Sequence, residues 1–332
     1  MRVLTVLFLT ALASMAMAAC IGSVTISPAQ LIRSCVDSVQ GAPASLYGTL
    51  IELRVQRALG AMVTGASLSL AGVLMQALLR NPLADPYVLG ISGGAAVGAL
   101  SALLCCELVW MMNLAAFGGA VLVAGLLFLL AYKDFRGSGT AEGSATTLLL
   151  TGVIISSGCI AIITLLLSLS PDSRLRSMVF WMIGDLSATR GSWFAWLVLL
   201  GVLVYVSGMA RAINISVLYS DSASTLGVPL GRLRKTLFFC AALLTASAVS
   251  NAGSIGFVGL IMPHACRFAW GPDHRLLLPA SVLAGGSFLV LADMLSRTLI
   301  APQQLPVGVI TALVGVPVFL VQLHQHRQHH GR

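Results

Sequence analysis

The sequence predicts an all-α integral membrane protein, in which one polytopic domain of about ten transmembrane helices occupies residues 1–332. Of these residues, 58% are hydrophobic and only 9% are charged, whereas about a quarter of an ordinary soluble protein is charged. Apolar segments of about 20 residues, the length that crosses a bilayer as a helix, recur from one end of the chain to the other. Because lipid offers the backbone no hydrogen-bond partners, these segments are expected to be helices, and they leave no room for a sizeable soluble domain.

Proline, glycine and polar residues divide the apolar sequence into ten segments. The segment at residues 257–270 is short and contains Pro263, His264 and Arg267, so it is predicted to be either a full span or a half-helix that enters the membrane from one side. The predicted helices cover residues 3–22, 57–79, 87–106, 113–132, 146–168, 192–209, 236–255, 257–270, 276–296 and 306–323.

The distribution of basic residues predicts the orientation of these helices. With the N-terminus inside, twelve lysines and arginines fall on the cytoplasmic side and seven fall outside, and both lysines, Lys133 and Lys235, are inside. This asymmetry follows the positive-inside rule, so both termini are predicted to be cytoplasmic. The excess of basic residues on the cytoplasmic side would face anionic lipid, which accounts for the net charge of +8. No nucleic-acid partner is indicated.

Residues 80–98, RNPLADPYVLGISGGAAVG, form a polar break between two hydrophobic helices. Pro82 and Pro86 cannot continue a helix, and the three glycines that follow at a spacing of four offer a flat face for close helix packing. Two interpretations are open. The segment is either one mouth of a membrane pathway or an ordinary connection followed by a packing helix.

Two predicted cytoplasmic segments have the composition of docking elements. Residues 210–235 contain SASTLGVPLGRLRK, in which Ser222 or Ser224 could cap a short helix that Gly227 ends. Residues 271–275, GPDHR, form a tight polar turn. A short helix on the cytoplasmic face suits contact with a soluble partner, and a solvated loop with snorkelling arginines is the alternative.

The cysteines and histidines do not predict a metal site or a cofactor. The seven cysteines include no CxxC pair and are expected to pack among apolar side chains. The sequence before Cys20 resembles a lipoprotein signal, but its apolar run is long enough to be the first transmembrane helix, which we favour. The histidine-rich tail at 324–332 is expected to be solvated and disordered rather than metal-binding.

Several catalytic motifs are missing. The two lysines follow Tyr132 and Arg234, so the GxxxxGK[ST] nucleotide-binding loop is impossible, and neither HExxH nor GxSxG occurs. The protein is therefore not expected to be an enzyme or to hydrolyse ATP by itself. Asp293 lies four residues before Arg297, a spacing that predicts an ion pair within one helix rather than an ion-coupling site.

Two long strings resemble the FecCD family of ABC-importer permeases. The first runs from LRVQR at 53–57 to the end of LLRNPLADPYVLGISGGAAVGAL, and the second, which contains GFVGLIMPH, lies within residues 253–320. The resemblance implies the type II importer fold and transport of a metal chelate: a ferric siderophore, haem or cobalamin. It also implies a homodimer of permeases in the bacterial inner membrane, working with two cytoplasmic ATPase subunits and a periplasmic binding protein.

The resemblance also implies roles for individual residues. Arg54, Arg57 and Arg297 would receive carboxylates of the binding protein. Asn81 and Leu83 would form the cytoplasmic gate, faced by the segment from Ser144 to Thr147, in which Ser144 and Thr146 are the gate candidates. The residues that would couple the permease to the ATPase are Ser222, Ala223, Leu226, Gly227, Val228, Pro229, Arg232, Asp273, His274 and Arg275.

Some features leave alternatives open. Gln56 stands where relatives usually carry proline, and IGDL at 183–186 departs from the family pattern, which leaves the geometry of the outer loops undetermined. An ion-gradient-driven secondary carrier and a membrane scaffold without transport activity are the competing hypotheses. Among cargoes, the strings resemble the siderophore and cobalamin branches more than the haem branch.

Overall fold

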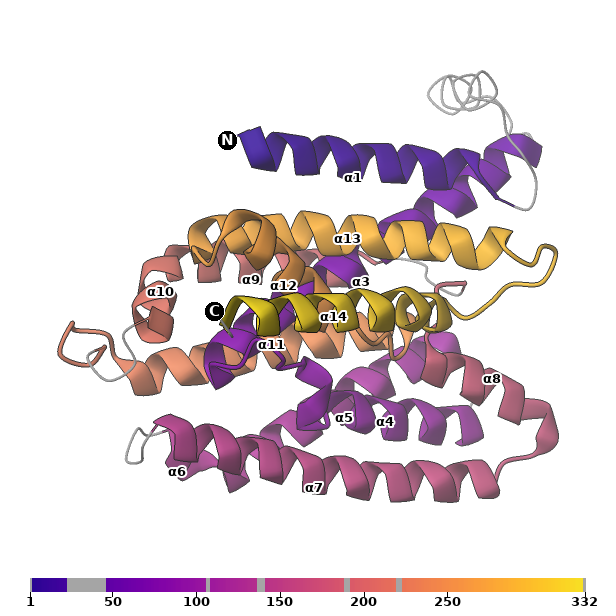
Figure 1. Ribbon diagram of the computed structural model, residues 1–332. Coiled ribbons are helices and arrows are strands. Elements are labelled where there is room, and N and C mark those ends of the chain that lie inside the picture. Colours follow the sequence, from indigo (N-terminus) through magenta and orange to yellow (C-terminus); the bar gives the residue numbers. More distant parts are fainter. Residues whose placement is uncertain are drawn as a thin grey trace.

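The computed structural model describes residues 2–22, 46–105, 108–135, 141–187, 192–218 and 223–330. Within these ranges the chain forms helices and short connections and contains no β-strand. The N-terminus of α1 (Arg2–Cys20) and the C-terminus of α14 (Val307–His330) lie at the same end of the bundle, together with α10 (Ala210–Leu218), which we call the α10 end (Figure 1). The opposite end, which holds α8 (Asp172–Ile183), we call the α8 end.

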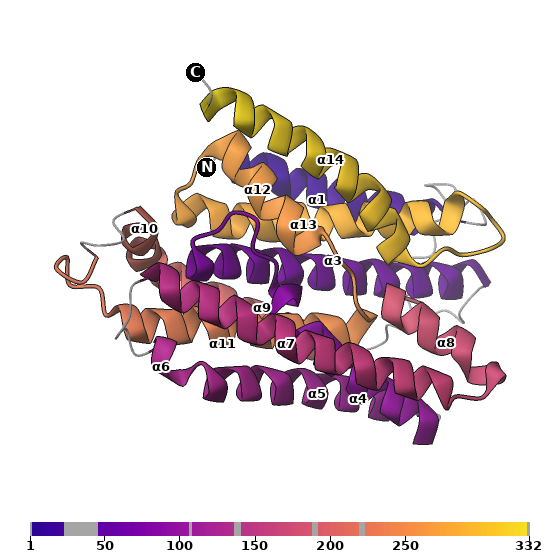
Figure 2. The same ribbon diagram turned by 60° about the horizontal axis from the view of Figure 1, so that its bottom comes forward.

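The remaining helices lie between or at these two ends, and Figure 2 shows them from a second direction. They are α3 (Leu46–Leu79), the 3-10 helix η1 (Pro86–Leu89), α4 (Ile91–Cys105), α5 (Val109–Leu130), α6 (Tyr132–Phe135), α7 (Ala141–Ser168), α9 (Trp193–Gly208), α11 (Leu230–Ala252), α12 (Val258–Trp270) and α13 (His274–Thr298).

Each of the ten predicted hydrophobic segments coincides with a helix. Six helices, α1, α3, α5, α7, α11 and α13, are long and apolar enough to cross a membrane, and α9 with α10 would make a seventh span bent by 63°. Helix α4 has 15 residues and α12 has 13, so neither reaches across about 30 Å of hydrocarbon at 1.5 Å per residue. The count of ten full spans, and the predicted orientation, therefore stay predictions.

Helix α3 is the centre of the bundle. It is the most deeply buried of the candidate spans, and α1, α11, α12 and α13 all pack against it. Small residues permit these contacts, because a Cβ added to Gly72 would lie 1.9 Å from the carbonyl oxygen of Gly259, and one added to Gly65 would lie 2.3 Å from that of Gly285. Between helices in lipid the hydrophobic effect gives no driving force, so van der Waals packing at such close backbone contacts stabilises the bundle instead.

The two short helices begin beside the middle of α3 and lead to opposite ends of the bundle. Gly259, at the start of α12, lies against both the Leu68 carbonyl and Pro86, and the Ile255 backbone N–H donates to the Tyr87 hydroxyl at 3.1 Å. Helix α4 runs from here to the α8 end, whereas α12 runs to the α10 end (Figures 1 and 2). The 13 residues of α12 have the length of the predicted half-helix, and its place in the membrane stays a prediction.

The contact between α3 and α12 is testable. We expect Gly72→Ala to lower the free energy of unfolding by about 1–3 kcal/mol, because the added methyl group overlaps the Gly259 backbone, which cannot move independently. The measurement is the midpoint of thermal unfolding in detergent. Gly118→Ala in α5 is the matched control, since a Cβ at Gly118 meets no atom within 4 Å. Equal midpoints for the two variants would contradict the described packing.

Candidate functional site

Three arginines predicted to dock a partner lie together at the α8 end, around Asp293. Arg57 holds this carboxylate with two nitrogens: Nη2 lies 2.8 Å from Oδ1, and Nε donates to Oδ1 at 2.9 Å and to Oδ2 at 3.1 Å. Arg297 Nε lies 3.1 Å from Oδ2, which confirms the predicted pair within α13. The Asp293 side chain is only 1% exposed. We call Arg54, Arg57, Arg297 and Asp293 the arginine cluster.

Two members of the arginine cluster also bind the end of α1. Arg54 Nη1 donates to the carbonyl oxygens of Cys20 at 3.0 Å and Ala19 at 3.3 Å, and Arg297 Nη2 donates to that of Ala18 at 3.4 Å. The last carbonyl groups of a helix lack partners within the helix and carry its partial negative charge. Both arginines are buried, so they fasten α1 to α3 and α13, a role that the sequence did not indicate.

The arginine cluster keeps a net positive charge because three guanidinium groups share one carboxylate. Arg57 is its most exposed member, with 13% of its side chain accessible, and its Nη1 donates to Gln304 Oε1 at 3.0 Å. A carboxylate that approaches the cluster would meet guanidinium groups that are already oriented, which favours bidentate hydrogen bonding. The docking role itself stays a prediction.

The described part of the predicted coupling segment has the hydrogen bonds with which a helix ends. Residues 223–227 form successive turns, in which Gly227 N–H donates to the Ser224 carbonyl and Val228 N–H donates to the Ala223 carbonyl, both at 3.1 Å. Ala223 and Val228 are buried, so they anchor both ends of this turn. Gly227, at φ +81°, occupies a left-handed conformation that suits glycine. Ser222 lies outside the described residues.

The helix near this segment is α10, which packs against the start of α13 through Asn214. The Asn214 Nδ2 donates to Asp273 Oδ1 at 2.7 Å, and its Oδ1 accepts from the His274 backbone N–H at 2.9 Å. Asp273 Oδ1 also accepts from the Arg275 N–H at 3.0 Å, which caps α13. These two donors, first the Arg275 amide and then Asn214, lower the pKa of Asp273 below its ordinary value.

The Asn214 bonds therefore join α10 to the predicted coupling residues Asp273 and His274. His274 is buried, whereas Leu226, Pro229, Arg232 and Arg275 are exposed and available to a partner. Asn214 was not among the predicted residues. Its role depends on contacts 59 and 60 residues away along the chain, for which the local sequence contains no signal.

The gate candidates begin with a turn after α3. Asn81 Oδ1 accepts from the Leu83 N–H at 2.9 Å, and the Asn81 carbonyl accepts from the Ala84 N–H at 3.0 Å. Leu83 is 44% exposed and Thr146, at the start of α7, is exposed as well. The side chain of Ser144 lies outside the described residues. The approach of Asn81 and Leu83 to Thr146 stays a prediction.

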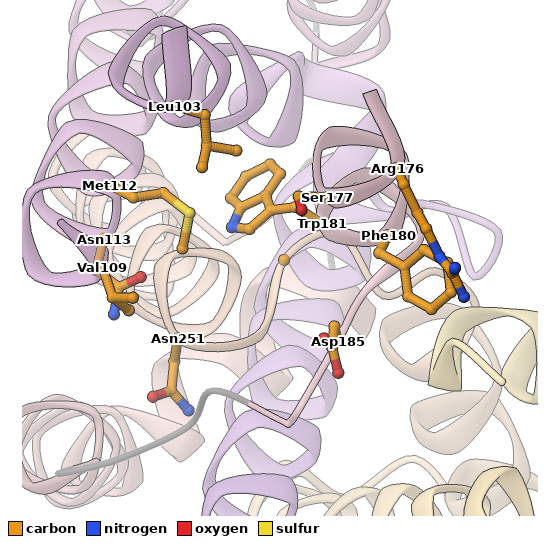
Figure 3. Close-up of a pocket in the computed structure, with 11 residues that line it drawn as sticks. Leu103, Val109, Met112, Asn113, Arg176, Ser177, Phe180, Trp181, Asp185 and Asn251 are labelled. Carbon is orange, nitrogen blue, oxygen red and sulfur yellow. The ribbon is translucent and has the colours of Figure 1, made fainter. Parts of the chain in front are cut away.

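Two cavities at the α8 end were not predicted from the sequence. The first, of about 410 Å³, lies among α4, α5, α8 and the end of α11, with Trp181 near its centre and Arg176 beside Phe180 at its edge (Figure 3). The second, of about 460 Å³, lies among α5, α9 and α11. Asn113 and Asn251 line both cavities.

The model of the FecCD transport family matches residues 7–325, nearly the whole chain. The chain belongs to this family. As a FecCD permease it is a multi-pass membrane protein of the ABC-importer type rather than a catalytic enzyme, and its relatives do not favour the ion-gradient carrier.

Curated relatives of this FecCD permease include three proteins from distant organisms. It is 43% identical over 288 residues to the ABC transporter permease protein YvrB of Bacillus subtilis, covering 84% of this chain and 79% of that protein. It is 38% identical over 301 residues to the cobalamin import system permease BtuC of Halobacterium salinarum, with coverage of 89% and 79%. It is 36% identical over 308 residues to the vitamin B12 import system permease BtuC of Escherichia coli, with coverage of 90% and 92%.

Two solved structures resemble the FecCD permease in fold. A metal-chelate type ABC transporter in an inward-facing conformation matches with a TM-score of 0.82 and 28% identity, covering 97% of this chain and 98% of that one. The Streptococcus pneumoniae PsaBC complex matches with a TM-score of 0.55 and 18% identity, which is a likeness of fold alone. The helical architecture described above is therefore that of an ABC-importer permease.

The arginine cluster predicts a large stability effect at Asp293. Asp293→Ala should lower the free energy of unfolding by about 3–5 kcal/mol, because it leaves Arg57 and Arg297 without their shared carboxylate in a buried site. Glu52→Ala is the control: Glu52 is exposed and accepts a hydrogen bond from Gln56 of its own helix, so a change within about 0.5 kcal/mol is expected. Thermal unfolding in detergent measures both, and similar small losses would disprove the proposed importance of the pair.

The cap at Asp273 predicts a dependence on pH. Asp273→Ala should destabilise the protein by about 1 kcal/mol at neutral pH, because Arg275 and Asn214 lose their acceptor. Since the folded pKa of Asp273 lies below its ordinary value, its charge stabilises the protein above about pH 3.9, and this contribution is lost as the pH falls through the folded pKa. The difference between the wild type and the variant should therefore shrink on acidification. A difference that grows would refute the assignment.

Proposed function

We propose that the protein is the transmembrane subunit of an ABC importer that moves a metal chelate, of which cobalamin is the first candidate, into the cytoplasm. The similarity to cobalamin and vitamin B12 permeases over about nine-tenths of the chain carries this proposal. The solved metal-chelate type transporter supports the wider substrate class. ATP hydrolysis is supplied by a separate subunit, because the sequence has no nucleotide-binding loop.

The proposed assembly is a homodimer in the bacterial inner membrane, with two cytoplasmic ATPase subunits and a periplasmic binding protein. One exposed face of α7 supports a pathway wall. It carries Ser157, Gly158 and Thr164 among apolar residues, and the two hydroxyls donate to carbonyl oxygens of the same helix at 3.0 and 2.9 Å. A wall whose hydroxyls are already satisfied binds cargo weakly, which suits passage rather than retention.

Coupling would run from the α10 end toward the centre. Closure of the ATPases would push on the exposed side chains of Leu226, Pro229, Arg232 and Arg275. The Asn214 bonds would transmit this displacement to α13, which packs along α3. Such movement of whole helices, rather than local unfolding, is the ordinary way in which packed elements transmit a switch. Asn81, Leu83, Ser144 and Thr146 would close the cytoplasmic side of the pathway.

Docking would take place at the α8 end, on the arginine cluster. Acidic groups of the binding protein would be attracted by its net positive charge and would exchange hydrogen bonds with Arg57, the most accessible arginine of the three. Electrostatic complementarity of this kind fixes the orientation of a complex and speeds its formation. Arg54 and Arg297 would support the surface from below by holding α1.

Uptake in reconstituted vesicles tests the proposed function. We expect labelled cobalamin to enter only when the cognate ATPase and binding protein are present, with no effect of an ionophore. Arg57→Glu should reduce uptake at least about tenfold by reversing a docking charge, whereas Arg57→Lys, which keeps the charge, should retain most of it. Uptake without an ATPase subunit would exclude the proposal. Normal uptake by Arg57→Glu would instead exclude docking at this cluster.

A further inference from the structure

We propose that the two cavities at the α8 end hold one phospholipid whose headgroup carries both a phosphate and a primary ammonium group, such as phosphatidylethanolamine. The proposal does not depend on the cargo or on the ATPase. It depends on the shape of the cavities, on their aromatic rim, on a buried hydroxyl without a partner and on a pair of opposite charges.

The cavities adjoin one another and are large enough for part of a lipid. Their volumes are about 410 and 460 Å³, and they share Asn113 of α5 and Asn251 of α11 as lining residues. In Figure 3 these two amides lie on one side of the first cavity, and Arg176 and Phe180 lie on the other. The two cavities therefore lie next to each other, with these amide groups where they meet.

The second cavity has an aromatic rim. Trp110 is 63% exposed and Trp193 is 68% exposed, and tryptophan at this degree of exposure is typical of the membrane interface. Inside the rim, the Phe117 and Phe194 rings meet edge to face with their centroids 5.5 Å apart. Because the rim is apolar and open toward the surface of the bundle, an acyl chain fits this part of the site better than a water-soluble ligand.

Polar groups beneath the rim fit the ester region of a lipid. The Ser247 side chain is 1% exposed and lines the second cavity, and within the described part of the chain its hydroxyl has no hydrogen-bond partner. A buried hydroxyl without a partner is costly. The Asn251 Nδ2 donates one of its two hydrogens to Thr64 at 3.0 Å, so the Ser247 hydroxyl and the Asn113 amide would be the main donors to ester carbonyl oxygens, which can only accept.

The charges of the first cavity predict the headgroup. Arg176 and Asp185 are the two charged residues that line it. The Arg176 guanidinium lies 5.5 Å from the centroid of the Phe180 ring, whereas Arg174 is bound to the carbonyl oxygens of Leu103 and Leu104. Asp185 accepts from both the N–H and the hydroxyl of Ser187 and has lone pairs left for a further donor.

One cation and one anion in the same cavity complement a zwitterion. The phosphate would pair with Arg176, and the ammonium would donate hydrogen bonds to Asp185. Phosphatidylcholine carries the same net charge but its quaternary nitrogen has no N–H to donate, and phosphatidylglycerol has no cationic group. The site should therefore distinguish the three lipids.

Native mass spectrometry of the delipidated full chain in detergent tests the proposal. The probes are phosphatidylethanolamine, phosphatidylcholine and phosphatidylglycerol with identical acyl chains. We expect phosphatidylethanolamine to bind at least about tenfold more tightly than either of the others, a ratio that one charge-assisted hydrogen bond can supply. Equal affinities, or a preference for phosphatidylglycerol, would overturn the headgroup assignment.

Matched variants locate the site. Arg176→Gln should weaken phosphatidylethanolamine binding, Asp185→Asn should remove its advantage over phosphatidylcholine, and Ser247→Ala should weaken all three lipids equally. Asp172→Asn on the exposed side of α8 and Arg211→Gln at the α10 end should change nothing. A melting temperature within a few degrees of the wild type shows that each variant is folded. If folded Arg176, Asp185 and Ser247 variants bind like the controls, the proposal is wrong.

Discussion

The close approach of glycine backbones around α3 is the constraint on which the rest of the structure depends. Helices in lipid are not driven together by the hydrophobic effect, so their contacts must come from packing at short range. The contact of Gly72 with Gly259 brings α12 this close to α3, and the contact of Gly65 with Gly285 does the same for α13. Once these two helices are fixed on α3, the positions of the arginine cluster and of the α13 cap follow.

Helix α13 connects the two candidate sites. At its first residues the Asp273 cap and the Asn214 bonds hold α10, and at its last turns Asp293 and Arg297 hold α3 and α1. A single helix of 25 residues therefore touches the proposed ATPase surface at one end and the proposed docking surface at the other. Because it is buried along most of its length, a shift at either end has to be shared with α3.

The sequence predicted those features that depend on local composition. The length of the apolar segments located ten of the helices, and the i,i+4 spacing predicted the ion pair of Asp293 with Arg297. Pro263 and its polar neighbours indicated that α12 could be a short helix. Contacts between distant residues left no such signal, which is why Asn214 and the capping of α1 by Arg54 were missed. Gly227 was predicted to end a short helix, and its left-handed conformation and the two turn hydrogen bonds around it fit that role, whereas Ser222, one of the two predicted caps, lies outside the described residues.

The two short helices, α4 and α12, each occupy about half the length of the bundle. A helix that crosses the whole membrane tilts as one rod, so a push on its inner end displaces its outer end as well. Helices α4 and α12 instead begin near one another beside the middle of α3, where the Ile255 to Tyr87 hydrogen bond and the contact of Gly259 with Pro86 form the joint. A displacement of α12 at the α10 end therefore reaches α4 at the α8 end through this joint rather than along one continuous rod.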